Sequence, residues 1–335
     1  MVKMAGIIEN SESQKRQYID AESVFDELRR VRKDAAQTRG GMFWREVSGG
    51  RYLIRTSPRG AHKSLGPESP ETLLIYKNFT ERKAAVAERL SLIEAAADEQ
   101  RRLNRALRVG RVPPVVVGVL NALDAAGLAE HFTVVGTHSL YAYESACGVR
   151  FVPAAMATRD IDLLFDTRKH LAFFSRMKEV DASFLGLLKK ADKTFVRLED
   201  KKETVRNASG FEVDVIRRMA KDGDPHPLRL SDDEDDVWAV QASTGDRILG
   251  SPRFSQMVVG TNGEMAVMHT MHPMDFVKIK RALGNYPTRD PLKRTKDLLQ
   301  ADLVEELVRS HMPQYLRVEG PSDEQEEQAP RPPIG

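Results

Sequence analysis

The stretch Thr158-Arg-Asp160-Ile-Asp162-Leu-Leu-Phe165 places two aspartates in an otherwise apolar strand pattern. Because side chains alternate between the two faces of a strand, Asp160 and Asp162 project from the same face and can share one cation. A second strand pattern, from Phe211 to Ile216, carries Asp214 in its middle. If the two strands are neighbours in one sheet, the third carboxylate reaches the same place. We therefore predict Asp160, Asp162 and Asp214 as catalytic and metal-binding residues.

Carboxylates grouped in this way suit Mg²⁺, with Mn²⁺ as the alternative ion, because hard cations prefer oxygen ligands and complete their shell with substrate phosphates. Two such ions about 3.5 to 4 Å apart can activate an attacking hydroxyl and stabilise departing pyrophosphate. Aspartates two residues apart also arise by chance, as at Asp222 and Asp224. A functional interpretation is favoured because aspartate is depleted in strands and costly to bury without a partner. Glu212, on the same strand face as Asp214, is either a substitute ligand or a solvated neighbour.

A turn that combines glycine with hydroxyl residues precedes these strands. Residues 132–135 predict a short buried strand, and Gly136-Thr137-His138-Ser139 joins it to a helix that ends near Gly148. Free backbone N–H groups and the positive end of a helix dipole hold phosphate at such junctions. We predict that Gly136, Thr137 and Ser139 bind nucleotide. The alternative is a turn that only caps the helix.

Together with Val134-Val-Gly136-Thr137, the two aspartate stretches resemble the signature of the nucleotidyltransferase superfamily with the DNA polymerase β-like fold. Within it the chain is similar to the bacterial branch of nucleotidyltransferase-fold proteins, with a looser likeness to the nucleotidyltransferase toxins of abortive-infection systems. The resemblance implies a mixed-sheet nucleotidyltransferase core. The sequence pattern adds an N-terminal helical and β segment and C-terminal helices, so we expect an α+β fold. The gap from Gly136 to Asp160 is longer than is common in the superfamily, and Thr137 stands where serine is usual.

The activity that this resemblance implies is transfer of a nucleoside monophosphate from an NTP donor to a hydroxyl acceptor on RNA or protein, with release of pyrophosphate. The alternative is a non-catalytic nucleotide- or nucleic-acid-binding module on the same fold, against which the complete aspartate trio argues. A toxin-like role, with a neutralising partner protein, is compatible with the enzymatic interpretation.

Basic residues cluster in two further places. The predicted helices over 273–283 and 290–309 carry a dense group: Lys278, Lys280, Arg281, Arg289, Lys293, Arg294 and Lys296. We predict that Lys278 and Lys296 bind nucleotide, because they match positions of functional lysines in similar toxins; a solvated helix face is the alternative. Arg101, Arg102, Arg105, Arg108 and Arg111 form either a polynucleotide-facing stripe or another solvated face.

Composition limits the remaining possibilities. The chain has 335 residues, of which 41% are hydrophobic, which is enough for a substantial core, and its net charge of +2 identifies no nucleic-acid partner. A single cysteine, Cys147, allows no intramolecular disulfide, and no apolar run approaches the roughly 20 residues that span a bilayer. We therefore expect a cytoplasmic protein with no membrane partner.

The pattern of predicted elements divides the chain into five parts. These are a flexible N-terminus (1–16), an N-terminal helical and small β region (17–112), the nucleotidyltransferase core (113–225), a C-terminal hairpin and helical region (226–317) and a disordered tail (318–335). The N-terminal region is predicted to hold a helix through 18–31, two short strands at 42–44 and 52–55, and one long helix over 81–107. Thr261-Asn262-Gly263 predicts a β-hairpin turn in the C-terminal region.

Overall fold

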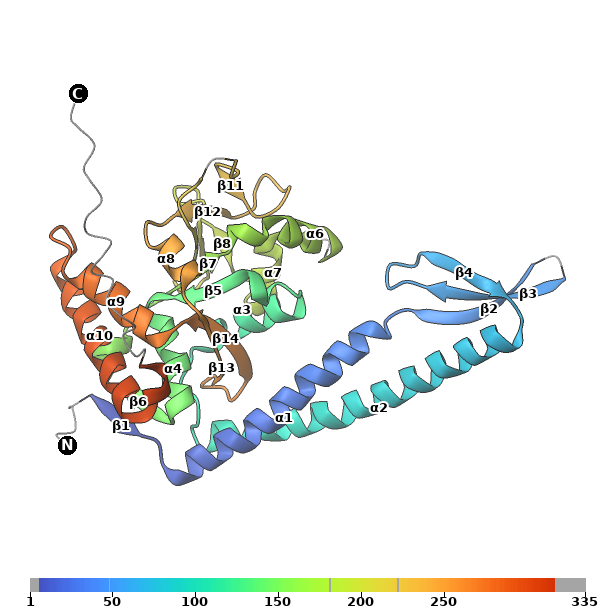
Figure 1. Ribbon diagram of the computed structural model, residues 1–335, viewed down its shortest axis with the longest axis horizontal. Helices are drawn as coiled ribbons and strands as arrows, with labels where there is room; N and C mark the ends of the chain where they lie inside the picture. The colour runs from blue at the N-terminus through green and yellow to red at the C-terminus, as the bar shows by residue number, and fades with distance from the viewer. Residues whose placement is uncertain (1–5, 48, 181, 222, 317–335) are drawn as a thin grey trace. The chain divides into compact units, whose positions relative to one another are not determined.

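The computed structural model describes residues 6–47, 49–180, 182–221 and 223–316, so the predicted tail over 318–335 lies outside the described residues. The chain divides into two compact units, each described by itself (Figure 1). Unit 1 contains the chain up to Glu9, Gly118–Gln256 and the chain from Val267 onward, whereas unit 2 contains Asn10–Val117 and Met257–Ala266.

Unit 2 is a long helical hairpin that carries a small sheet where its first helix ends and its second begins (Figure 1). Its elements are α1 (Glu12–Gln37), β2 (Gly41–Val47), β3 (Gly50–Thr56), β4 (His62–Pro67) and α2 (Pro70–Ala106). Both helices begin with a capping box, at Ser11 and Ser69. The box at Ser69 satisfies the first backbone N–H groups, so α2 begins well before the predicted residue 81. The two predicted strands are confirmed, and β4 was not predicted.

Unit 1 is built on a mixed sheet, as predicted. Its strands run in the order β11-β12-β10-β7-β5, and β9 also pairs with β10 and with β8. Strands β7 and β10 are parallel, whereas β5 is antiparallel to β7. The bounds are β5 (Phe132–Val135), β7 (Asp160–Phe165), β8 (Val196–Arg197), β9 (Thr204–Arg206), β10 (Glu212–Arg217), β11 (Leu228–Arg229) and β12 (Trp238–Gln241).

Helices cover this sheet and complete unit 1. They are α4 (Ser139–Cys147), α5 (Pro153–Met156), α6 (His170–Val180), α7 (Phe184–Ala191), α8 (Gly245–Gly250), α9 (Pro273–Gly284) and α10 (Pro291–His311). Helix α3 (Pro114–Ala125) and the hairpin strands β13 (Arg253–Val259) and β14 (Met265–Met271) run across the division between the units. Most of the predicted core and of the C-terminal region, separated in the sequence at residue 225, thus belongs to one unit; residues 113–117 and 257–266 belong to unit 2.

The beginning of the chain is more ordered than the sequence suggested. Strand β1 (Ile7–Glu9) pairs antiparallel with β6 (Val149–Phe151), and α1 begins at Glu12. The predicted flexible segment over 1–16 therefore contains regular structure from Ile7 on, while residues 1–5 lie outside the described residues. Across the described ranges, no helix combines the length and apolarity that crossing a membrane requires.

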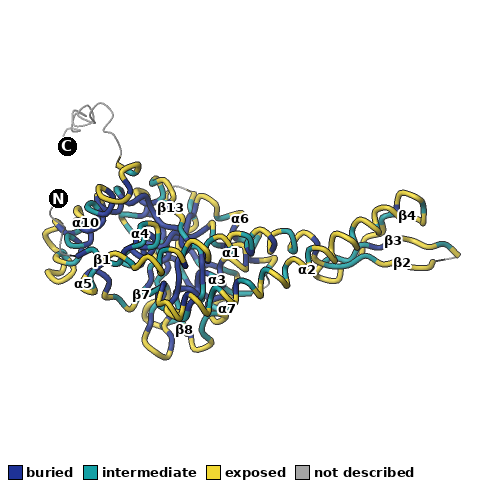
Figure 2. Tube along the Cα trace, turned by 90° about the horizontal axis from the view of Figure 1, so that it is seen from below, coloured by how far each residue is buried: buried dark blue, intermediate teal, exposed yellow. Residues whose placement is uncertain are grey.

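The core of unit 1 lies along the central strands, which Figure 2 shows as buried. Ile161, Leu163, Val213 and Val215 are completely buried. Because strand side chains alternate, these residues hold one face of β7 and β10 in the core and turn the intervening carboxylates to the other face. The apolar half of each pattern thereby positions the acidic half.

Candidate active site

Strand register brings the predicted aspartates together. On the parallel strands β7 and β10, Asp162 lies opposite Asp214, and Asp160 lies opposite Glu212. The expectation that the two acidic strands are neighbours is thus confirmed. The carboxylate of Glu212 accepts a hydrogen bond from Arg206 Nε at 2.7 Å. Glu212 is therefore a neighbour of the site, and its carboxylate is already paired with Arg206.

The three carboxylates differ in their surroundings. A hydroxyl donates to each of two: Thr158 to Asp160, and Thr204 to Asp214 at 2.5 Å. Burial, together with the charges of Asp160 and Asp214, raises the pKa of Asp162 to about 7. Burial also raises the pKa of Asp214. The two strands therefore place carboxyl groups close together in surroundings that disfavour their ionised form.

The side chains do not already form a metal cage. Within the described ranges, no three His, Cys, Asp or Glu side chains converge on a point that could hold an ion. The predicted convergence is therefore present in the backbone register, whereas the described side chains do not form such a group. The donor set nevertheless fits a hard divalent cation, since carboxylates that raise one another's pKa gain from a shared positive charge.

Gly136 fits closely against this acidic cluster. Its φ is +69°, and a β-carbon added there would lie 2.7 Å from Asp162 Oδ2. Only glycine satisfies both conditions, since L side chains avoid this region of φ and the carboxylate occupies the space. The predicted strand-to-helix turn is confirmed, because residues 136–138 form a single 3₁₀ turn between β5 and α4.

The two hydroxyl residues of the turn have different surroundings. Thr137 lines the cavity described below, and its hydroxyl oxygen accepts from Gln300 Nε2 at 3.1 Å, which leaves its proton available to a ligand. Ser139 is completely buried, and its hydroxyl donates to the Val134 carbonyl at 3.1 Å. Ser139 therefore braces the turn rather than lining the cavity, contrary to its predicted place in the nucleotide site.

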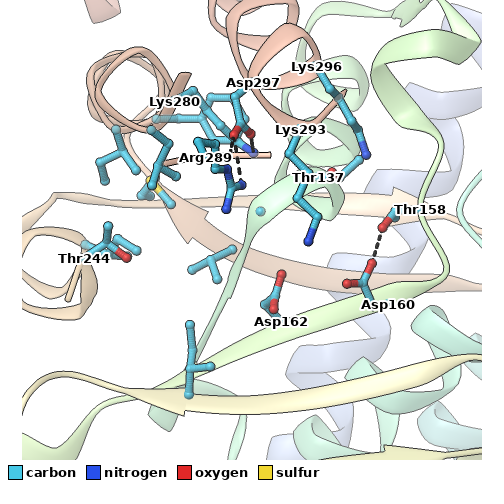
Figure 3. A pocket seen from close by; sticks show the side chains of 18 of the residues that line it. Thr137, Thr158, Asp160, Asp162, Thr244, Lys280, Arg289, Lys293, Lys296 and Asp297 are labelled. Atoms are coloured by element: carbon cyan, nitrogen blue, oxygen red, sulfur yellow. Dashed lines mark hydrogen bonds and ion pairs between the residues drawn. The ribbon is translucent and has the colours of Figure 1, made fainter. Parts of the chain in front are cut away.

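A cavity of about 470 Å³ lies beside the strand β7. Asp160 and Asp162 line it on one side together with Gly136, whereas Asp214 does not line it. The opposite side comes from α9, α10 and the segment between them and is basic (Figure 3). Apolar residues also line it: Val135, Ala157, Ile216, Ile248, Met271, Phe276, Ile279 and Leu283. The volume is in the range of small-molecule sites, which are largely apolar with a few convergent polar groups.

One buried carboxylate organises part of the basic side. Asp297 accepts from Lys280 Nζ at 2.7 Å and pairs with Arg289 Nη2 at 2.9 Å (Figure 3). Lys280 and Asp297 are both buried. Buried ions need such partners, so Asp297 fixes both cations where α9 meets the start of α10.

Two further lysines of α10 line the cavity beyond this ion pair. Lys296 donates to the Ala157 carbonyl at 2.5 Å, and burial together with the charge of Lys280 lowers the pKa of Lys296. In Figure 3 the side chain of Lys293 points from α10 toward Asp160 and Asp162. The basic side of the cavity thus has one carboxylate, that of Asp297, and four cations. This side therefore has an excess of positive charge, which suits phosphate.

Lys278 and Lys280 lie on different sides of α9. Lys280 is one position from Ile279 and four from Phe276, both of which line the cavity, whereas Lys278 is exposed and does not line it. The prediction that Lys278 binds nucleotide is therefore not supported by its position, while Lys296 lies where predicted. Lys280 is one of the basic residues noted in the sequence. The spacing of apolar residues over 276–283 marks one side of the helix, and this signal distinguishes Lys280 from Lys278.

Comparison with known families agrees with this geometry. A family described as Nucleotidyltransferase matches residues 115–319, more than half of the chain. The chain belongs to this nucleotidyltransferase family. The matched segment includes the acidic strands, the glycine turn and the basic helices, so an NTP donor and nucleotidyl transfer follow from membership. No curated protein and no solved structure matches the chain.

Proposed function

We propose that this nucleotidyltransferase is Mg²⁺-dependent and moves a nucleoside monophosphate from an NTP to a hydroxyl of RNA or protein, releasing pyrophosphate. The observation that carries the proposal is the arrangement of the cavity, in which Asp160 and Asp162 face an excess of lysine charge. Phosphoryl transfer needs positioning and charge stabilisation more than covalent chemistry from the protein. An acidic side for cations and a basic side for phosphates supply both.

The carboxylates of Asp160, Asp162 and Asp214 would hold Mg²⁺, which supplies Lewis-acid activation of the phosphate and of the acceptor hydroxyl. Lys293 and Lys296 would contact the triphosphate and stabilise the negative charge that gathers on pyrophosphate as the bond to the leaving oxygen breaks.

The turn at Gly136 adds a second set of donors. Backbone N–H groups at the start of a helix can bind phosphate, and the Thr137 hydroxyl has a proton to donate. Asp297 would act through the two cations it binds, holding them in place before the nucleotide arrives. The cavity thus has separate groups for the metal, for the triphosphate and for orientation.

The test is to supply each of the four NTPs, labelled at the α-phosphate, together with Mg²⁺ and either cellular RNA or cellular protein. We expect label to enter one acceptor class in amounts equal to the pyrophosphate released, and to require the metal. NTP binding without transfer to either class would instead identify a non-catalytic nucleotide-binding module.

A further inference from the structure

Positive charge is concentrated in one part of unit 2. Residues 39–67, which contain β2, β3 and β4, carry six lysine or arginine side chains and one glutamate, a net charge of +5. By contrast, α1 has as many acidic as basic residues, and α2 has a net charge of +1. At the other end of α2, Arg101 of the predicted stripe pairs with Asp98 at 3.1 Å. The small sheet is therefore the basic part of this hairpin, in a chain whose total charge is nearly neutral.

The two faces of the sheet have different neighbours. One face lies against the beginning of α2, where the Trp44 and Tyr76 rings are 5.9 Å apart and the Arg55 guanidinium lies 4.3 Å from the Phe79 ring centroid. Arg55 also donates to the Gly41 carbonyl at 3.1 Å. Basic and aromatic residues on this face therefore hold the sheet to the helix.

The opposite face, called here the outer face, carries Phe43, Arg45, Tyr52 and His62 together with the buried Ile54. Strand register places Arg45 directly opposite Tyr52, and Phe43 is two residues from Arg45 on the same side of β2. The Arg45 guanidinium lies 5.6 Å from the Phe43 ring centroid and contacts His62 Nδ1 at 2.9 Å. Phe43 and Tyr52 each retain 36% of their surface exposed. The tube in Figure 2 shows much of this sheet as exposed.

Two exposed aromatic rings beside one arginine have a specific use. Within the described part of the chain, Arg45 contacts the Phe43 ring and the His62 imidazole and pairs with no carboxylate, so its charge is not cancelled there. Aromatic rings stack on unpaired bases, while adjacent cations neutralise the phosphate backbone. Stacking on flat bases uses the rings and the cation together.

We propose that the outer face binds single-stranded RNA. Single-stranded RNA is favoured over duplex DNA because RNA loops and ends offer unstacked bases, whereas duplex DNA keeps its bases inside the helix. The proposal does not rest on the nucleotidyl-transfer chemistry, since the outer face would bind RNA whether or not that RNA is the acceptor.

The test measures binding of a fluorescently labelled, mixed-sequence single-stranded RNA to the full chain in EDTA without NTP, so that no transfer takes place. We expect Phe43→Ser with Tyr52→Ser to weaken binding roughly tenfold or more, because two stacking rings are lost. The matched control is Ile19→Ser with Leu92→Ser, which removes two exposed aliphatic side chains from the helices and should bind as the parent does. Circular dichroism and melting confirm that each variant is folded.

Charge is tested separately by Arg45→Gln against Arg16→Gln, an equal change at an exposed position on α1. Arg45→Gln should reduce the slope of log affinity against log salt by about 0.7, the value for one contact with single-stranded phosphate, whereas Arg16→Gln should leave it unchanged. Equal weakening by the aromatic and aliphatic variants, or equal slopes for the arginine variants, would overturn the proposal. So would duplex RNA that binds as tightly as the single strand, or single-stranded DNA that binds more tightly than RNA.

Discussion

Asp162→Asn should stabilise the protein at alkaline pH while leaving its shape unchanged. Burial and the charges of Asp160 and Asp214 raise the pKa of Asp162 from 3.8 to about 7. A carboxyl whose pKa is raised on folding binds its proton more tightly in the native state. The stability that this carboxyl group contributes is therefore fully present below its pKa in the unfolded chain. That contribution is lost as the pH rises through its pKa in the folded protein. Asparagine has nearly the same volume and does not ionise, so the variant escapes this loss.

The size of the effect follows from the two pKa values. At about 1.4 kcal/mol per pKa unit, the parent should lose up to about 3 kcal/mol between pH 5 and pH 8 from this group alone. The free energy of unfolding of Asp162→Asn minus that of the parent should grow by the same amount over that window. Linked titration of the two neighbouring carboxylates makes this an upper bound.

Urea unfolding at pH 5, 6, 7 and 8 in the presence of EDTA measures this difference. Added Mg²⁺ should stabilise the parent at pH 8 more than the variant, since only the parent keeps all three carboxylates. A variant that is several kcal/mol less stable than the parent at pH 8 would contradict the reasoning, because that result identifies Asp162 as one partner of a structural ion pair.

Three further substitutions test other parts of the cavity. Gly136→Ala should weaken NTP binding and lower the free energy of unfolding by about 1 kcal/mol or more, because the methyl group meets the Asp162 carboxylate at a positive φ; unchanged NTP affinity in calorimetry would refute this. Asp297→Asn should cost roughly 3 to 5 kcal/mol in urea unfolding, since it leaves two cations without their carboxylate, and a loss below about 1 kcal/mol would show that they find other partners. Lys293→Gln should raise the KM for NTP roughly tenfold with little change in melting temperature. The control Lys278→Gln, an equal charge change outside the cavity, should leave KM unchanged. Equal effects of the two variants on KM would mean that only total charge matters.

The acidic strands could be predicted from the sequence because two signals coincide there. Ile161 and Leu163 alternate with Asp160 and Asp162, and this period of two identifies both the strand and its polar face. Buried apolar residues then fix the register, since a slip of one residue would move the carboxylates into the core. Gly136 was predictable for a related reason, because a glycine between a strand and a helix indicates a turn.

Other parts of the site depend on contacts between distant residues. Asp297 is far in sequence from the acidic strands, and it takes its place only when α10 packs against α9. Thr204 of β9 reaches Asp214, its direct partner on the neighbouring strand β10, and no local pattern reveals this pairing. Strand β4 was missed because Gly66 and Pro67 are poor strand formers, and pairing with β3 overrides that preference.

The most direct test of the proposed chemistry compares two neighbouring carboxylates of the same sheet. Asp160→Asn removes a proposed metal ligand, whereas Glu212→Gln removes the charge opposite it on β10, where the carboxylate is engaged by arginine. With labelled NTP, acceptor and increasing Mg²⁺, we predict that Asp160→Asn loses transfer by roughly a thousandfold or more, while Glu212→Gln stays within about threefold of the parent. Transfer by Asp160→Asn at the rate of the parent, with the same dependence on Mg²⁺, would contradict the assignment of this site.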